Sequence, residues 1–307
     1  MQIMSVNVRC RSAMLHGLLQ SSPLDIIMVQ EPWYGKINTT RDDHNPEGVD
    51  VLGATANNMW TCYLPDHSNT DICKVAIYVR NNVASSTFIC CRYDLSLSTC
   101  NTLVLDLTIG DELLRLINVY HHIPDKGHSL HPILTYELDP LVPTLMAGDF
   151  NTHGTWSLPG ATMSPWAGAL EDWFEDNELT ICNPSGIATW HGRQEQSPSI
   201  LDLILLNAPA VSSEQFTTDI SVSFGQSLGS DHALLALFWF PKSSPLSTHA
   251  SPSIKGFIID DDLRETWCKE FCGIPPPDIS SRDSLMLAVQ RLLSDINDVC
   301  ASLFEPC

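Results

Sequence analysis

Short apolar runs separated by polar turns dominate the first 240 residues of this 307-residue chain. Runs of strand length predict strands over residues 3–10, 24–33, 50–54, 59–64, 73–79, 86–93, 101–109, 113–120, 141–151, 179–184, 199–207, 216–224 and 232–240. Helical spacing of apolar residues predicts helices over 12–22 and 165–177, whereas the polar segment 36–50 is predicted to be a loop. Because strands dominate without regular alternation, we expect an α/β protein with two packed sheets and helices outside.

The character of the chain changes after Pro241. Residues 241–254 are rich in Pro and Ser and predict a linker. Residues 259–272 and 281–304 have helical patterns, so 255–307 is expected to be a short helical C-terminal appendage to a domain spanning 1–240.

Polar residues interrupt or end several apolar strands in this pattern. Burying an unpaired carboxylate in a strand is expensive, so several such residues are explained together if they converge on one cleft. Carboxylate and amide oxygens are donors suited to Mg²⁺ held by one or two acids and a substrate phosphate. The residues concerned are Asn7, Gln30, Glu31, Asp149, Asn151, Asp202, Asp231 and His232.

Composition and charge limit the classes of protein that fit this pattern. The chain has 16 Lys and Arg against 36 Asp and Glu, a net charge of −20 that disfavours strong phosphate binding. Its 11 Cys show no CxxC pair, which fits a reducing compartment. The N-terminal segment lacks the apolar core of a signal peptide, and no apolar run approaches membrane-spanning length. We therefore expect an intracellular protein that is neither secreted nor membrane-embedded.

The ordered motifs VNV, VQE, INVY, GDFN, SILD and GSDHALL resemble those of the endonuclease/exonuclease/phosphatase superfamily. The longer stretches IIMVQEPWYGKI, DPLVPTLMAGDFNTHGTWS and LGSDHALLAL are similar to the apurinic-endonuclease-like domain of non-LTR retrotransposons, in particular fungal ones. The resemblance covers about residues 1–240, and the later GFIIDDDLRETWCKEF is similar to the segment following that domain. It implies a four-layer α/β sandwich, two packed mixed β-sheets flanked by helices.

The resemblance implies a metal site and an activated water. Glu31, with Asn7 beside it, should hold Mg²⁺, with Mn²⁺ as an alternative ion. Asp149 should orient or deprotonate the attacking water, and Asp231 should support the metal or the water.

The resemblance also implies groups that contact the scissile phosphate. Asn151 should donate to a nonbridging oxygen, and Tyr120 and His232 should contact the same phosphate. Asp202 should accept from the other ring nitrogen of His232 and fix its tautomer.

Four further residues are expected to bind substrate. Thr189 and Ser199 precede Asp202 at offsets that match related retroelement endonucleases, Ser230 matches their SDH motif, and Asn118 lies in INVY. One departure is that Ile123 stands where many relatives have the Asn of a YxPN motif.

The function implied is a Mg²⁺-dependent DNA endonuclease that nicks target DNA to leave a 3′-OH. The expected partner is DNA, bound weakly because of the net charge of −20, and the resemblance implies a nuclear location without an obligate protein partner. Two alternatives are a phosphomonoesterase of the same superfamily, acting on inositol phosphates or nucleotides, and a catalytically inactive, domesticated interaction protein.

Overall fold

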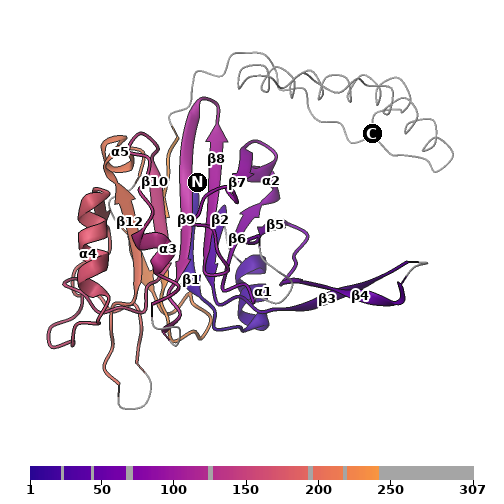
Figure 1. Cartoon of the computed structure of the whole chain (residues 1–307), viewed down its shortest axis with the longest axis horizontal. Coiled ribbons are helices and arrows are strands. Elements are labelled where there is room, and N and C mark those ends of the chain that lie inside the picture. The colour runs from indigo at the N-terminus through magenta and orange to yellow at the C-terminus, as the bar shows by residue number, and fades with distance from the viewer. Residues whose placement is uncertain are drawn as a thin grey trace. The chain divides into compact units, whose positions relative to one another are not determined.

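The computed structural model describes residues 1–21, 24–42, 45–66, 72–123, 127–192, 196–216 and 220–241. These residues form two six-stranded sheets and a separate two-stranded ribbon (Figure 1). The predicted linker at 241–254, apart from Pro241, and the predicted helical tail at 255–307 lie outside the described residues.

The first sheet is mixed and has the strand order β13-β14-β1-β2-β6-β5. Strand β1 runs parallel to β2 and antiparallel to β14, so the two chain ends of the described domain meet in one sheet. The strands are β1 (Gln2–Asn7), β2 (Ile26–Gln30), β5 (Trp60–Tyr63), β6 (Val75–Arg80), β13 (Ser221–Ser223) and β14 (Leu234–Phe238).

The second sheet is also mixed and has the strand order β11-β12-β10-β9-β8-β7. Strand β10 runs parallel to β9 and antiparallel to β12. The strands are β7 (Phe88–Cys91), β8 (Thr102–Ile109), β9 (Glu112–Tyr120), β10 (Thr144–Asp149), β11 (Leu179–Ile181) and β12 (Asp202–Asn207).

Three apolar clusters of the described residues hold the layers together. The largest lies between the sheets and joins side chains such as Met28 of the first sheet to Leu116 and Leu145 of the second. On the outer face of the first sheet, helix α1 (Ser12–Ser21) contributes Leu15 and Leu19. On the outer face of the second, helix α4 (Ala167–Asp176) contributes Leu170, Trp173 and Phe174, and α3 (His131–Leu134) contributes Ile133. The predicted four-layer α/β sandwich is therefore confirmed.

The prediction of a loop over residues 36–50 was wrong. Strands β3 (Tyr34–Asp42) and β4 (Asn45–Ala54) pair antiparallel as a ribbon that projects away from the sheets (Figure 1). Neither strand contributes a described residue to the three apolar clusters, and the segment shows no alternation of apolar and polar positions, which is the signal on which strand prediction depends.

Short helices also escaped prediction, because a single turn has no period to detect. These are α2 (Asn81–Ala84), α3 and α5 (Ala208–Ser212). Among the described helices, none is long and apolar enough to cross a membrane.

Candidate active site

The polar ends of the strands are explained by the two-residue period of side chains along a strand. Leu145 and Ala147 of β10 face the core between the sheets, so Asp149 faces the same space two residues later. The same step leads from Ile204 back to Asp202 in β12, and from Ile3 to Asn7 in β1. The candidate site is therefore the polar end of the core between the sheets.

Strand register then brings these residues side by side. Asp149 is the Cα partner of Tyr120 in β9 on one side and of Asp202 in β12 on the other. In the first sheet, Asn7 is the partner of Gln30. The two rows face each other, and Asn7 Nδ2 donates a 2.9 Å hydrogen bond across the gap to Asp149 Oδ2.

Two site residues leave the strand pattern through left-handed backbone. Simple alternation would point Glu31 away from the core because Gln30 faces it, but Glu31 has φ 47°. Its carboxylate Oε1 accepts a 2.8 Å hydrogen bond from the Tyr120 hydroxyl of the other sheet. Asn151 has φ 45°, and its backbone N–H donates to Asp149 Oδ1 at 2.9 Å. Such conformations cost about 1–3 kcal/mol each and cluster at functional sites.

Gly148 lets β10 pass close to β9 just before Asp149. It has φ 154°, and a Cβ atom there would lie 1.9 Å from the Val119 carbonyl oxygen. Only glycine fits this position, which accounts for the Gly-Asp pair at the end of the strand.

His232 and Asp202 form a buried pair at the centre of the site. The ring Nδ1 lies 3.1 and 3.0 Å from the two carboxylate oxygens of Asp202, and the residues are 5% and 2% exposed. Burial alone would lower the pKa of His232, but the carboxylates of Asp202 and Asp149 raise it to about 9. The imidazole is therefore protonated at neutral pH, with Nδ1 donating to Asp202.

Asp149 is buried beside this pair. Burial raises its pKa to about 7, against the opposing effects of His232 and of the hydrogen bonds from Asn7 and Asn151. The Asp149 Oδ2 atom lies 3.9 Å from His232 Nδ1. A carboxylate with a pKa near neutrality is suited to accept a proton from water at physiological pH.

Asp231 has partners that the sequence did not indicate. Arg9 Nη1 lies 3.2 Å from its Oδ1 atom, and Trp190 Nε1 donates to its Oδ2 atom at 3.2 Å. The carboxylate thus contacts a guanidinium and an indole, and its support of a metal or water stays a prediction. The chain has 16 Lys and Arg, and Arg9 lies two residues after the predicted site residue Asn7. This position is the signal by which Arg9 could have been predicted as a site residue.

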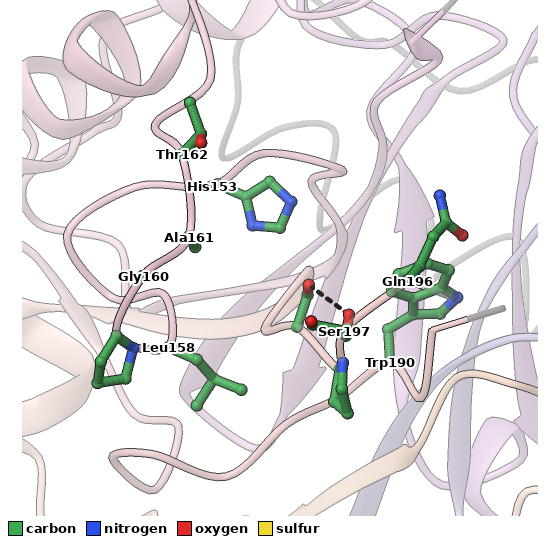
Figure 2. Close-up of a pocket in the computed structure, with 11 residues that line it drawn as sticks. His153, Leu158, Gly160, Ala161, Thr162, Trp190, Gln196 and Ser197 are labelled. Carbon is green, nitrogen blue, oxygen red and sulfur yellow. Dashed lines mark hydrogen bonds between the residues drawn. The ribbon is translucent and has the colours of Figure 1, made fainter. Parts of the chain in front are cut away.

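A pocket of about 380 Å³ adjoins the site through Trp190, whose ring centroid lies 6.5 Å from that of His232. Figure 2 shows the segment Leu158–Thr162 on one side and Trp190, Gln196 and Ser197 on the other. Its lining combines apolar surface with hydroxyl, amide and imidazole groups, and Ser199 contributes to the wall. Ser199 was predicted to bind substrate, whereas Trp190 and Gln196 were not predicted, because no strand-end pattern marks them.

The other residues predicted to bind substrate have internal partners instead. Asn118 and Thr189 are fully buried, and Thr189 Oγ1 accepts from the backbone N–H groups of Leu201 and Asp202 at 3.0 and 2.9 Å. Ser230 Oγ donates to the Asn7 carbonyl at 2.7 Å and accepts from the His232 N–H at 3.1 Å. Their contact with substrate stays a prediction, and the hydrogen bonds of these side chains are made within the chain.

Two sets of donors in the described residues could hold a metal. Asp149, Asp202 and His232 are buried with potential ligand atoms within 4.8 Å of one another. In this set His232 Nδ1 lies 3.0 Å from an Asp202 carboxylate oxygen, so a cation bound there would have to displace the imidazole proton. Glu31 is only partly buried and accepts one side-chain hydrogen bond, from Tyr120, which leaves carboxylate lone pairs suited to a hard cation.

Comparison with known proteins agrees with this fold. The profile of the family described as endonuclease-reverse transcriptase matches residues 114–236. The chain has the fold of the endonuclease/exonuclease/phosphatase superfamily, and the predicted resemblance to retrotransposon endonucleases is confirmed.

The endonuclease domain of TRAS1, a telomere-specific non-LTR retrotransposon, is similar with a TM-score of 0.58 and 15% identity, covering 78% of this chain and 99% of that one. An endonuclease/exonuclease/phosphatase family protein from Leptotrichia buccalis C-1013-b has a TM-score of 0.46, 15% identity and coverage of 78% and 99%. D. rerio TDP2 with a single-strand DNA product has a TM-score of 0.46, 13% identity and coverage of 78% and 99%. No curated protein sequence matches the chain.

Proposed function

We propose that this protein is a Mg²⁺-dependent DNA endonuclease that cleaves a phosphodiester bond to leave a 3′-OH. The observation that carries the proposal is the convergence of Glu31, Tyr120, Asp149 and the His232–Asp202 pair at one end of the core between the sheets. A bound Mg²⁺ at Glu31 would supply positive charge to the scissile phosphate.

Asp149 is the base in this proposal. With a pKa of about 7, a large fraction of the Asp149 carboxyl group is ionised at neutral pH. The carboxylate is also basic enough to take a proton from an attacking water. Asn7 and the Asn151 N–H each hold one carboxylate oxygen, so the carboxylate is fixed before substrate binds. We assign Asn7 to positioning Asp149 as well as to the edge of the metal site.

Asn151 and His232 are the donors to phosphate, and Tyr120 would join them by turning its single hydroxyl hydrogen, which it gives to Glu31 at 2.8 Å, toward the phosphate. Burial strongly raises the pKa of the Tyr120 phenol, which therefore keeps that hydrogen. Asn151 Nδ2 gives one hydrogen to the His121 carbonyl at 2.9 Å and retains a second for an oxyanion. His232 uses Nδ1 for Asp202, which leaves its Nε2–H for the developing negative charge.

The pocket beside Trp190 favours a nucleic acid as the substrate. Its volume of about 380 Å³ is in the range of ligand sites, and Gln196 and Ser197 offer donors and acceptors beside the Trp190 ring. We propose that it receives a nucleotide next to the cleaved bond. Because the chain carries a net charge of −20, binding should be weak and strongly dependent on salt.

Nicking of supercoiled plasmid tests the proposal. We expect relaxation of the plasmid with Mg²⁺, none in EDTA, and recovery when Mg²⁺ is restored. Glu31→Gln and Asp149→Asn should abolish nicking, whereas Glu137→Gln, an exposed carboxylate change near Asn207, should not affect it.

Equal cleavage in EDTA would exclude the metal mechanism. Release of inorganic phosphate from inositol phosphates or nucleotides, with no nicking, would favour a phosphomonoesterase. Absence of both activities from folded protein would favour the inactive interaction protein.

A further inference from the structure

A buried network of polar side chains joins the two sheets next to the site, at Gln30 and Asn118. Gln30 and Asn118 are each 0% exposed, and Gln30 Nε2 donates to Asn118 Oδ1 at 2.6 Å. Asn118 Nδ2 donates to the Val29 carbonyl at 3.0 Å and to the Ala76 carbonyl at 2.9 Å. One side chain of the second sheet thus binds two neighbouring strands of the first, β2 and β6.

The amide orientations follow from the chemistry of the partners. The carbonyl oxygens of Val29 and Ala76 can only accept, so Asn118 must present its Nδ2 group to them. Its Oδ1 atom then faces Gln30, which must donate through Nε2. Gln30 Nε2 also donates to Ser5 Oγ at 3.1 Å, which adds β1 to the network.

Stability alone does not account for the network. Among the described residues, Gln30 Oε1 is buried without a hydrogen-bond donor, and an unsatisfied buried acceptor is destabilising. An apolar residue facing the core at this position, like Met28 two residues earlier, would carry no such cost. The network also fixes relative position, because its hydrogen bonds are directional whereas apolar packing is not.

The position of the network in the chain indicates what it fixes. Gln30 immediately precedes Glu31, and Asn118 lies two residues before Tyr120 on the same face of β9. Glu31 belongs to one sheet and Tyr120 to the other, and their 2.8 Å hydrogen bond closes the site across the gap. A small slip of one sheet over the other would separate them.

We propose that Gln30 and Asn118 form an inter-sheet latch whose role is to position Glu31 against Tyr120. Both are positioning residues that act through the Glu31–Tyr120 contact and do not touch substrate. The effect of the latch on catalysis rests on the proposed function. The coupling between the latch and the Glu31–Tyr120 contact does not, because it is measured by stability alone.

Asn207 provides a matched control. Like Asn118 it is buried, at 1% exposed, and makes three hydrogen bonds to other parts of the chain: it accepts from Thr144 and Ala210 N–H at 2.8 and 3.2 Å and donates to the Val142 carbonyl at 2.9 Å. It lies at the end of β12 opposite Asp202. Asn118→Ala and Asn207→Ala therefore remove equal numbers of hydrogen bonds at opposite ends of the second sheet.

The experiment is a double-mutant cycle with Tyr120→Phe, read by chemical denaturation. Tyr120→Phe removes the hydrogen bond to Glu31. We expect it to destabilise the Asn118→Ala protein less than the wild type, because the latch that aligns the bond is already lost. In the Asn207→Ala background it should cost as much as in the wild type. Gln30→Met, which keeps the length of the side chain, gives a second cycle if Asn118→Ala does not fold.

Nicking rates give the second readout, measured well below the melting temperature of each variant. Asn118→Ala should lower the rate of the folded protein roughly 10²-fold, on the scale of small misplacements in an active site, while Asn207→Ala leaves it unchanged. The latch would be overturned if Tyr120→Phe lowered the free energy of unfolding equally in the wild type and in the Asn118→Ala protein. Equal nicking rates for Asn118→Ala and Asn207→Ala would also overturn it. A wild type that does not nick in any divalent cation would overturn the proposed function instead, and the stability cycle would still decide on the latch.

Discussion

Replacing His232 or Asp202 with alanine should slow nicking by similar factors, and replacing both should slow it little further. The two side chains form one buried unit, since both carboxylate oxygens lie within 3.1 Å of the ring Nδ1. Asp202 holds the ring in one tautomer and favours its protonated form. Removing the ring therefore removes most of what the acid does, and such residues give non-additive losses.

The magnitude follows from the role of a positioned acid or base. Such a group contributes roughly 10²–10⁴-fold to the rate, or about 3–5 kcal/mol at about 1.36 kcal/mol per factor of ten. We expect each single change to cost this amount and the double change to add less than about 1 kcal/mol, within the usual spread for coupled residues. Initial nicking rates under single-turnover conditions, paired with thermal melts of each variant, measure both quantities.

The pH profile separates positioning from mere packing. In the wild type His232 stays protonated until the pH passes about 9, so activity that needs the imidazolium declines only above that value. Asp202→Asn removes the largest influence that raises this pKa while burial continues to lower it, so the alkaline limb should move toward or below the ordinary value of 6.5. An unchanged limb, or full additivity of the two alanine substitutions in the logarithm of the rate, would refute the pairing and assign Asp202 to the stability of the strand.

Three further predictions concern stability. Gly148→Ala should destabilise the fold by about 3 kcal/mol or more in denaturant titration, because the new Cβ would lie 1.9 Å from the Val119 carbonyl oxygen. Gly168→Ala should instead stabilise the fold by about 0.5–1 kcal/mol, because Gly168 lies in α4 with no atom within 4 Å of the new Cβ. The pKa of Asp149 is about 7 in the folded protein and 3.8 in the unfolded chain, so the stability that this group contributes is present below pH 3.8 and is lost as the pH rises through 7. In EDTA, Asp149→Asn should therefore raise the melting temperature more at pH 8 than at pH 5. An equal increase at both pH values would contradict the raised pKa. A chain of residues 1–245 should melt at the temperature of the full chain, because the predicted linker marks a domain boundary, and an insoluble or molten product would show that the tail completes the core.

The sequence predicted the layers and most strands because their apolar patterns are long and face a core. The same patterns located Asn7, Asp149 and Asp202, since a polar residue that continues the core-facing period of a strand must lie at the end of the core between the sheets. The β3–β4 ribbon was not predicted because its sequence lacks alternating apolar and polar positions.

The rest depends on geometry that no local pattern carries. Glu31 reaches Tyr120 only because its φ of 47° reverses the direction that alternation would give it, and the sequence shows a Glu-Pro step there, not a backbone angle. Asn118 was assigned to substrate because it stands in a motif, yet it binds the opposite sheet, a contact spanning 88 residues of sequence to Gln30. A motif thus identifies which residues matter together, whereas the division between those that touch substrate and those that hold the others in place is set by burial and by long-range partners. Where a motif residue is fully buried with every polar side-chain atom satisfied, as Asn118 is, positioning is the role that its chemistry permits.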